Sequence, residues 1–497
     1  MFEGLFAFGR SLVHFGTPEI VFYALLSSLV GVIVGALPGL TATMGLALMT
    51  TLTLKLPPDQ ALLILICTYV GAIYGGSRSA ILLNIPGTPA SAAACLDGHA
   101  LAKQGLAGRA MSIATTGSVL GTLIGMLMLA AFTPVLGNLA LRFGAYEFFW
   151  LALFGVIIAG TLTGDDPLKG WIAGIAGLFV ATVGQESQYA YERFAYGVRD
   201  LAGGFQLVPA LVGAFGFAEL LTAMRERRLP VTINPFDAVI PKLRDVTRYW
   251  RTILRSGLIG TGVGIVPGVG EDVAAWSSYA AAKRASKERE LYGKGSVEGL
   301  MAAETGDNAC VPGAVIPVLT LAIPGSAPAA VLMAAMIIHG IRPGPMIMVE
   351  NPQFVYDVVA MMLFATLGIL IYGLTLTRLL VQVLRVPQHI IVPIIFVLCT
   401  VGSFAISGRL FDVYVMLGFG LIGFCLRHHG YPMAPLVLGI VLGDLLEKNL
   451  RRALVLSDGD LSPFFTRPIA GAIAAIIFAT VAWKLVNLHR VRQRSFA

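Results

Sequence analysis

Residues 20–54 read IVFYALLSSLVGVIVGALPGLTATMGLALMTTLTL and contain no charged side chain. A helix needs roughly 20 apolar residues to cross the hydrocarbon core of a bilayer, so this stretch is long enough to enter a membrane. Pro38-Gly39 interrupts it near the middle. Proline removes a backbone N–H donor and clashes with the preceding helical turn, and glycine permits almost any backbone conformation. We therefore predict a membrane helix that is broken at residues 38–39.

The rest of the chain has the same apolar character. Its 497 residues are 56% hydrophobic and only 13% charged, and the mean hydropathy is +0.80. Soluble domains carry roughly 25% charged residues, so this chain has too few polar groups to cover a water-facing surface. Further apolar runs follow at intervals, and we predict an all-α polytopic membrane protein with roughly 11–13 membrane segments, including re-entrant or broken helices.

Three basic clusters indicate the orientation of the chain. Residues 225–255 hold eight Lys or Arg against three acidic residues, residues 283–294 hold five against two, and residues 489–494 read HRVRQR. Loops rich in Lys and Arg stay on the cytoplasmic side of a membrane, so we place the three clusters and the C-terminus there. Because the net charge of +7 is concentrated in short clusters between apolar runs, no nucleic-acid partner is expected.

The Pro-Gly breaks occur in two matching pairs. Residues 31–39 (GVIVGALPG) match residues 260–268 (GTGVGIVPG), and residues 80–88 (AILLNIPGT) match residues 318–326 (VLTLAIPGS). In lipid, irregular backbone survives only against protein or a polar cavity. Duplicated halves with interrupted helices at equivalent positions are the best sequence indicator of a transporter binding site. We therefore predict a duplicated membrane fold with a binding site at the breaks.

The two halves are expected to be inverted. The loop at residues 55–59 is nearly uncharged overall, whereas its counterpart at residues 283–294 is strongly basic, and such an opposite bias places the loops on opposite sides. Between the halves, residues 242–251 form either a basic interfacial helix, with Tyr249 and Trp250 at headgroup depth, or a plain cytoplasmic linker. The predicted parts are an N-terminal amphipathic segment (1–19), a first membrane repeat (20–224), a basic amphipathic linker (225–255), a second membrane repeat (256–468), and a C-terminal membrane helix with a basic cytoplasmic tail (469–497).

A broken helix offers binding groups for both an anion and a cation. Unpaired N–H groups at the start of its second half suit a carboxylate, and unpaired carbonyls at the end of its first half suit a cation such as sodium. For any single small polar residue near a break, hydrogen bonding between helices is the alternative. The substrate-binding candidates are Ser77, Arg78, Ser79, Asn84, Pro86, Gly87, Thr88, Pro324, Gly325 and Ser326. The sodium candidates are Gly39, Thr41, Thr43, Gly268, Gly270, Asp307 and Asn308.

Several charged residues admit two interpretations. Arg78 pairs with a substrate carboxylate or extends to a membrane surface. Glu271 and Asp272 follow a break directly and either cap a helix start, which we prefer, or bind a cation. Glu298 and Glu304 are expected to pair with the basic loop that precedes them. In addition, the Gly117, Gly121 and Gly125 stripe predicts close packing between helices.

No motif for enzymatic chemistry is complete. Residues 260–264 begin a glycine-rich pattern, but Pro267 stands where the last glycine of GxGxxG belongs, and the chain has no GxxxxGK[ST] or HExxH motif. His428-His429 lack metal-ligand spacing, and the five cysteines form no CxxC pair. We expect neither an enzyme nor a cofactor. An ion channel or a non-transporting membrane scaffold remains the alternative to a transporter, although duplicated broken helices suit an occluded site better than an open pore.

Several motifs occur in order along the chain. They are GALPGL (35–40), YGGS (74–77), ILLNIPG (81–87), LDG (96–98), YAAAKR (279–284), IPGS (323–326), HG (339–340), PGP (343–345) and the region 427–452. With these motifs the chain resembles, from about residue 31 to residue 468, the large membrane subunit (TctA family) of the tripartite tricarboxylate transporters. Asp307 precedes Asn308 where the family often has two Asn, and Arg78 and Glu271-Asp272 are unusual for it.

The resemblance implies partners and a mechanism. A periplasmic substrate-binding protein would deliver a carboxylate, a small four-helix membrane subunit would join this one in the bacterial inner membrane, and a cation gradient, usually of sodium, would drive import without ATP. The substrate would be a tricarboxylate such as citrate, a dicarboxylate or an aromatic acid, and the transport domain would move in an elevator-like manner. The positions that match family motifs are Pro38, Gly39, Ser77, Asn84, Pro86, Gly87, Thr88, Asn308, Pro324, Gly325 and Ser326.

Overall fold

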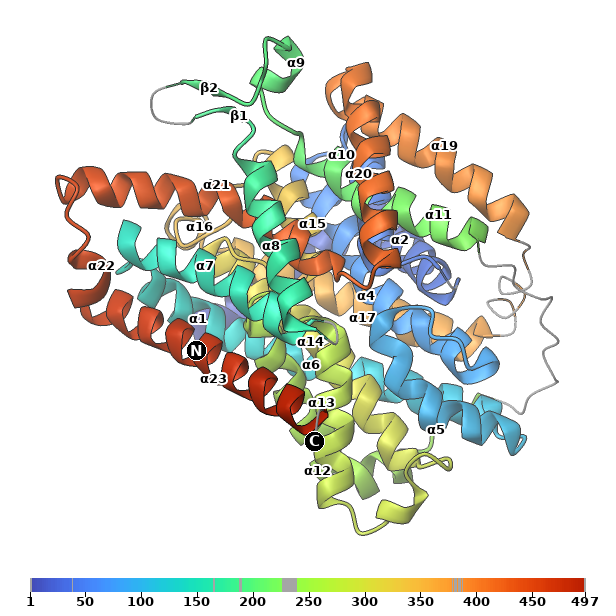
Figure 1. Ribbon diagram of the computed structural model, residues 1–497. Helices are drawn as coiled ribbons and strands as arrows, with labels where there is room; N and C mark the ends of the chain where they lie inside the picture. The colour runs from blue at the N-terminus through green and yellow to red at the C-terminus, as the bar shows by residue number, and fades with distance from the viewer. Residues whose placement is uncertain are drawn as a thin grey trace. The chain divides into compact units, whose positions relative to one another are not determined.

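The computed structural model is almost entirely helical (Figure 1). It describes residues 2–37, 39–163, 166–186, 190–225, 239–377, 379, 382, 386 and 388–495. Pro38 therefore lies outside the described residues, as does much of the predicted linker. This helical architecture confirms the all-α part of the predicted fold class.

The chain divides into two compact units. Unit 1 comprises residues 1–138 and 206–425, and unit 2 comprises residues 139–205 and 426–497. Both pairs of Pro-Gly breaks lie in unit 1. Its helices are α1 (Phe2–Phe15), α2 (Pro18–Ala36), α3 (Ala42–Leu52), α4 (Pro58–Leu83), η1 (Pro89–Ser91), α5 (Ala92–Lys103), most of α6 (Ala107–Ala140), α10 (Leu207–Leu211), η2 (Val212–Phe217), α11 (Ala218–Arg225), α12 (Leu243–Ile265), α13 (Gly270–Ala285), η3 (Arg289–Leu291), α14 (Val297–Leu321), α15 (Ala327–Ile338), α16 (Ile347–Glu350), α17 (Phe354–Thr375), α19 (Gln388–Ser407) and most of α20 (Leu410–His428).

Many of these helices are long and apolar enough to cross a bilayer. Nine such candidate spans occur among the described residues, and three shorter apolar helices accompany them at Ala42–Leu52, Pro167–Ala181 and Ala327–Ile338. The spans make this a multi-pass membrane protein. They are Pro18–Ala36, Pro58–Leu83, Ala107–Ala140, Ala145–Leu162, Leu207–Arg225, Phe354–Thr375, Ile390–Ser407, Leu410–His428 and Pro468–Val486.

Two helix pairs form the centre of unit 1. Helix α2 packs along α4, and α12 packs along α14. A Cβ atom at Gly35 would collide with the Ala72 carbonyl oxygen of α4, and one at Gly264 would meet the Cys310 carbonyl oxygen of α14. Glycine at these positions allows the two backbones to touch, as it does between membrane helices generally. The pairs thus hold both breaks against well-packed neighbours.

The glycine stripe on α6 has the packing role that its spacing predicts. A Cβ atom at Gly121 would collide with the Thr305 carbonyl oxygen of α14, and one at Gly125 would meet the Ala309 carbonyl oxygen one turn later. Helix α6 is therefore held close to α14, and this contact brings polar side chains of the two helices together.

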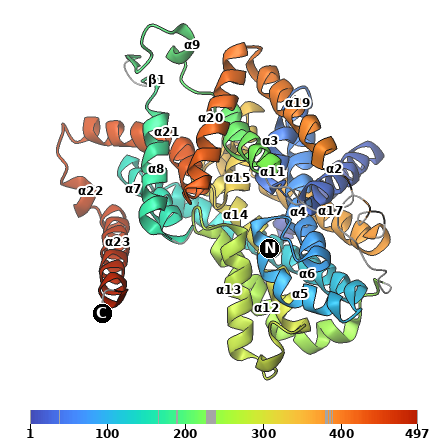
Figure 2. The ribbon, with the colours of Figure 1, turned by 45° about the vertical axis from the view of Figure 1, so that its right-hand side comes forward.

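Unit 2 is a smaller helical bundle with one hairpin. Helices α7 (Ala145–Leu162), α8 (Pro167–Ala181) and α21 (Met433–Leu456) pack together and lie side by side in both views (Figures 1 and 2). Strands β1 (Gly184–Gln185) and β2 (Glu192–Arg193) pair antiparallel. The remaining elements of this unit are α9 (Arg199–Ala202), α22 (Pro463–Thr466) and α23 (Pro468–Ser495).

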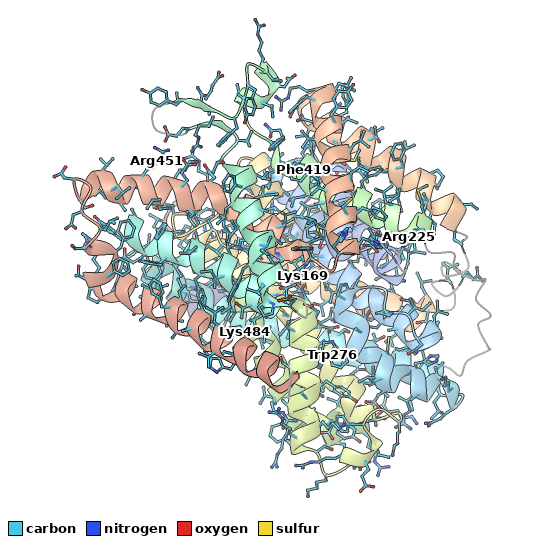
Figure 3. All side chains as sticks on the ribbon, in the orientation of Figure 1. Lys169, Arg225, Trp276, Phe419, Arg451 and Lys484 are labelled. Carbon is cyan, nitrogen blue, oxygen red and sulfur yellow. The ribbon has the colours of Figure 1, made fainter. Side chains whose placement is uncertain are left out.

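Arginines hold the hairpin of unit 2 against α21. Arg193 donates to both carboxylate oxygens of Glu447, with N–O distances of 2.5 and 2.9 Å, and Arg451 donates to Glu447 at 2.9 Å. Arg451 also pairs with Glu186 at 3.4 Å from its place on α21 (Figure 3). Burial would raise the pKa of Glu447, but the hydrogen bonds from the two arginines bring that pKa below its ordinary value. The hairpin is thus fixed by charge-assisted hydrogen bonds.

Candidate functional site

The first break separates α4 from η1. Helix α4 ends at Leu83 and is capped by Asn84, whose φ of 56° and ψ of 28° are left-handed. The chain then turns back, and the N–H of Gly87 donates to the Gly76 carbonyl oxygen at 3.3 Å. Thr88 is extended and leads into η1, and Ser91 accepts a hydrogen bond from the Thr88 N–H at 3.3 Å. Pro86 prevents the helix from continuing, because proline cannot donate to the helical ladder.

The second break, between α14 and α15, repeats this backbone geometry. Helix α14 ends at Leu321 and is capped by Ala322, with a φ of 56° and a ψ of 36°. The N–H of Gly325 donates to the Ala314 carbonyl oxygen at 3.3 Å. Ser326 is extended, and its hydroxyl accepts the N–H of Ala329 at 3.3 Å as the N-cap of α15. The sequence match between the two breaks is therefore a match in local structure.

Each break is also tied to the Pro-Gly turn of its own half. A Cβ atom at Gly87 would collide with the Gly35 carbonyl oxygen, and one at Gly325 would collide with the Gly264 carbonyl oxygen. In the second half, the N–H of Gly268 donates to the Pro324 carbonyl oxygen at 3.3 Å. The two interruptions of each half therefore form one local structure.

Around the breaks, helices of each half pack against helices of the other half. Helix α3, which follows the first Pro-Gly turn, packs against α15 of the second half, and α13, which follows the other turn, packs against η1 and α5 of the first half. Unit 1 thus gathers all four interruptions around its central helix pairs.

A buried network links three helices beside the first break. Ser77 on α4 donates to one carboxylate oxygen of Glu304 at 2.6 Å, and Ser118 on α6 donates to the other at 3.0 Å. The amide of Asn308 donates to Ser118 at 3.0 Å and to Asp307 at 2.8 Å. All five side chains are buried. The structure therefore brings the predicted residues Ser77, Asp307 and Asn308 together around an acid that was not predicted for the site.

Arg78 lies deep in the protein next to this network. Its side chain is 1% exposed, its guanidinium lies 4.4 Å from the centre of the Tyr74 ring, and one terminal nitrogen donates to Thr115 at 2.8 Å. Its other two nitrogens have no hydrogen-bond partner in the described part of the chain. The prediction that Arg78 extends to a membrane surface is wrong. A buried cation with two free donors is well suited to a carboxylate.

A second buried group connects α4 with the second break. The hydroxyl of Tyr69 on α4 donates to the carboxylate of Glu271 and lies 2.6 Å from the Ser326 hydroxyl oxygen. Glu271 stands in the first turn of α13, where the sequence placed it as a cap, and its side chain is 5% exposed. Tyr69 was missed by the sequence reasoning because it lies in an apolar run that gives no local signal.

The sodium candidates occupy separate positions. Thr41 caps α3 by accepting the Met44 N–H at 3.2 Å, and Gly39, Gly268 and Gly270 all have positive φ. No hydrogen bond joins Thr41 or Thr43 to Asp307 or Asn308 in the residues that the structure describes. The side-chain amide oxygen Oδ1 of Asn308 is buried and has no partner there, so it is an available acceptor beside the Asp307 carboxylate. The described residues contain no cluster of three His, Cys, Asp or Glu side chains that would hold a metal.

The predicted pairing with the basic loop is wrong for Glu304, whereas Glu298 does contact this loop, through the hydroxyl of Ser286 and not through a basic side chain. Glu304 contacts the hydroxyls described above, and Glu298 accepts the hydroxyls of Thr252 and Ser286, each at 2.6 Å. The sequence spacing does indicate that Glu304 lies near Asn308, since Glu304 comes one helical turn before Asn308 on the same face. The hydroxyl partners of Glu304, Ser77 and Ser118, come from segments far away in sequence and have no such signal.

A cavity in unit 2 has a different character. Its volume is about 470 Å³, and its lining consists of Phe179, Phe194, Tyr196, Phe205 and three aliphatic side chains. Such a lining offers little to neutralise a carboxylate. We therefore assign the candidate site to the breaks of unit 1.

The comparisons with known proteins agree with this geometry. Residues 21–438 match the Tripartite tricarboxylate transporter TctA family. The chain belongs to this family. A protein of Agrobacterium vitis described as an uncharacterized 52.8 kDa protein in the TAR-I ttuC' 3' region is 36% identical over 478 residues, or 96% of this chain and 95% of that protein. Another, described as an uncharacterized protein in the TAR-II ttuC' 3' region of the same organism, is 36% identical over 234 residues, or 47% of this chain and 97% of that protein. No solved structure matches the chain.

Membership of the TctA family accounts for the main features of the chain. The family is one of transporters, and the many apolar helices provide the membrane body that a transporter needs. The matched region includes the four interruptions and the network around Glu304, so the family relationship extends over the whole candidate site.

Proposed function

We propose that this chain is the large membrane subunit of a secondary transporter that imports small carboxylates across the bacterial inner membrane. The observation that carries this proposal is the pair of breaks with the same backbone geometry, at residues 84–88 and 322–326, within one compact unit. Irregular backbone at membrane depth marks the binding site in many transporters, because it provides unpaired polar groups without exposing them to lipid.

The substrate site is proposed at the first break and the adjoining end of α4. Arg78 supplies a positive charge, and Ser77, Ser79 and Thr88 supply hydroxyls, while the start of α15 at Ser326 supplies N–H groups. Arginine binds carboxylates through two parallel N–H donors, and Arg78 has two nitrogens available for such a contact. A tricarboxylate such as citrate, a dicarboxylate or an aromatic acid fits this chemistry. The further substrate candidates are Asn84, Pro86, Gly87, Pro324 and Gly325.

Sodium is proposed as the coupling ion. The carboxylate of Asp307 and the free side-chain amide oxygen Oδ1 of Asn308 support a cation site near the middle of α14. Buried acids in a membrane protein usually serve an ion or proton pathway, since an isolated charge there is costly. Backbone carbonyls near Gly39, Gly268 and Gly270, together with Thr41 and Thr43, are the additional proposed ligands.

Two inverted repeats and an elevator-like motion complete the proposed mechanism. Each half contributes a Pro-Gly turn and an Ile-Pro-Gly break to unit 1, and the halves exchange packing partners there. Both features support a symmetric origin for residues 20–224 and 256–468. A periplasmic binding protein would deliver the substrate, and a small four-helix membrane subunit would complete the transporter. The basic C-terminal tail is placed in the cytoplasm.

Uptake into liposomes tests this proposal. The chain would be reconstituted with its small subunit and binding protein, and uptake of labelled citrate and a panel of other carboxylates would be measured with and without an inward sodium gradient. We expect uptake only with the gradient, and we expect Arg78→Gln to abolish it while Arg78→Lys retains part. Uptake driven by a proton gradient alone would refute sodium coupling.

The same assay separates the remaining alternatives. A channel would pass ions or acids down their own gradients without accumulation, and a non-transporting scaffold would give no flux with any substrate. Accumulation of an acid against its gradient excludes both of these classes. The identity of the best substrate in the panel would also decide between tricarboxylates, dicarboxylates and aromatic acids.

A further inference from the structure

The start of α12 presents an unusual density of exposed positive charge. Lys242, Arg244, Arg248 and Arg251 are all exposed within ten residues. Arg248 pairs with Glu288 of the neighbouring loop. The other three make no ion pair with any residue that the structure describes. This end of the helix therefore has positive charge that no acidic residue in the described ranges pairs with.

An exposed apolar stripe runs along the same part of α12. Leu243, Trp250, Leu254 and Leu258 are 77%, 54%, 44% and 45% exposed. Trp250, Leu254 and Leu258 are spaced four residues apart and so lie on one side of the helix that follows the kink at Tyr249, and Leu243 is exposed just before that kink. The opposite side is buried against α13 and α14. The stripe therefore faces away from the core of unit 1.

The two features together have the composition of a helix that lies at a membrane surface. Such helices have aromatic and leucine side chains toward the acyl chains and flanking Lys or Arg toward the headgroups. The Arg251 guanidinium lies 5.4 Å from the centre of the Trp250 ring, so a cation and an amphipathic aromatic ring are held side by side. That arrangement places a positive charge where tryptophan prefers to lie, at headgroup depth.

Neighbouring elements increase the positive charge of this region. Helices α5, α12 and α13 lie at one end of unit 1 in both ribbon views (Figures 1 and 2). Lys103 stands at the end of α5, and Lys283 and Arg284 at the end of α13. Lys287 and Lys294 are exposed in the loop that follows α13. The cytoplasmic leaflet carries anionic lipids that attract such clusters, and positive loops are cytoplasmic.

We infer that the start of α12 is a binding site for anionic phospholipid of the cytoplasmic leaflet. Lys242, Arg244 and Arg251 contact the phosphate and the anionic headgroup, and Leu243, Trp250, Leu254 and Leu258 lie against the acyl chains. Guanidinium groups suit phosphate because they offer several N–H donors in a fixed plane. A zwitterionic lipid of the same chain length lacks the net charge that this site would neutralise.

The position of the site gives lipid binding a route to the second break. Helix α12 runs from Leu243 to Ile265 with a kink at Tyr249, and the Pro-Gly turn follows directly. That turn is bonded to the second break through Gly268 and Pro324. A lipid that fixes the start of α12 therefore acts on the same helix that ends at the proposed transport site. Lipid binding itself does not depend on the proposed transport activity.

Lipid binding is measured on the purified full-length chain in nanodiscs. Brominated phosphatidylglycerol and brominated phosphatidylcholine would be compared as quenchers of tryptophan fluorescence, and the Trp250→Phe variant would isolate the contribution of this ring. We expect phosphatidylglycerol to quench the Trp250 signal at several-fold lower mole fraction than phosphatidylcholine. Equal quenching by both lipids, or none, would overturn the inference, and would leave an anionic protein as the partner of the basic patch.

A charge-matched pair of variants tests the location. The triple variant Lys242→Gln, Arg244→Gln, Arg251→Gln removes three charges from α12, and the control Lys283→Gln, Lys287→Gln, Lys294→Gln removes three from the neighbouring helix and loop. We expect at least a tenfold loss of phosphatidylglycerol preference in the first and less than twofold in the second. Equal losses would show attraction to the whole basic face and refute a site on α12. Thermal unfolding of both variants would confirm that each is folded.

Discussion

The two Ile-Pro-Gly breaks share their backbone geometry but differ in how they are held. The second break is buried, and the Ser326 hydroxyl bonds to the Ala329 N–H and lies next to Tyr69. At the first break, Asn84 and Pro86 are exposed, and the buried Thr88 hydroxyl has no partner among the described residues. One break is thus fixed by the protein, while the other retains polar capacity for a ligand.

Matching sequence motifs therefore need not have matching roles. A buried hydroxyl without a partner costs free energy unless something else satisfies it, so Thr88 is a natural substrate contact. Ser326 already caps α15 and contacts Tyr69, so its role includes holding the second break in place. We therefore expect variants at the second break to change stability and variants at the first break to change substrate binding.

The largest effect is expected where both breaks are alike. Gly87→Ala and Gly325→Ala each place a Cβ atom against a carbonyl oxygen of the partner helix, at Gly35 and Gly264 respectively. Backbone cannot move away as a flexible side chain does, and overpacking of about 3 kcal/mol corresponds to roughly a 100-fold loss. We expect uptake in liposomes to fall by that order in both variants. The matched control is Gly262→Ala on α12, where nothing lies within 4 Å of the added atom.

Removal of one hydroxyl should affect the second break alone. Tyr69→Phe deletes the donor to Glu271 and the contact with Ser326. Loss of a buried hydrogen bond to a charged group costs about 1.5–3 kcal/mol, so we expect uptake to fall roughly 10- to 100-fold. Hydrogen exchange should increase at residues 322–330 and stay unchanged at residues 84–91. Tyr372→Phe, which removes a single bond to Leu25 on α2, is the control, and a loss of equal size there would argue against a special role for Tyr69.

A smaller and different effect is expected at the first break. Thr88→Val removes a hydroxyl that has no protein partner, so thermal stability should stay the same while KM rises by about fivefold to tenfold, as expected for one hydrogen bond to a ligand. Ser326→Ala should instead lower stability by about 1 kcal/mol, because it removes a helix cap. Thermal unfolding in detergent and uptake at several substrate concentrations measure both. If Thr88→Val destabilises the protein as much as Ser326→Ala, the distinction between the breaks fails.

The smallest effect concerns the left-handed residues that end α4 and α14. Both residues, Asn84 and Ala322, have a φ of 56°. Asparagine tolerates this left-handed conformation because its short polar side chain can form local hydrogen bonds, whereas the methyl group of Ala322 cannot. Ala322→Gly should therefore stabilise the protein by about 1 kcal/mol. Asn84→Gly should change stability by less than about 0.5 kcal/mol. Equal shifts in the thermal unfolding of the two variants would contradict this assignment of strain.

The sequence predicts the breaks well because their causes are local. Proline and glycine act on their own backbone and the adjacent turn, so Pro86 and Pro324 mark the interruptions without knowledge of the rest of the fold. The stripe at Gly117 and Gly121 is also readable, since its spacing alone defines a helix face. The helical membrane architecture follows in the same way from the length and apolar character of the runs.

The partners of buried polar groups could not be predicted in this way. Glu304 lies next to a basic loop in sequence, but the fold places it against Ser77 and Ser118 from two other helices. Tyr69 resembles any other aromatic residue in an apolar run until α4 is packed beside Glu271. Such pairs depend on which helices meet, and that choice is set by packing over segments more than 180 residues apart.

The glycine contacts between α2 and α4, and between α12 and α14, have a consequence for engineering new specificity. At Gly35 and Gly264, as at Gly75 and Gly313, an added carbon would meet the backbone of the partner helix. The two helices of each pair cannot shift along one another by one residue, so each pair is rigid up to the break at its end. A mutant library for altered substrate choice should therefore keep these glycines and vary Ser77, Ser79 and Thr88. Changes at these three positions alter the polar groups offered to the substrate and leave the alignment of the paired helices unchanged.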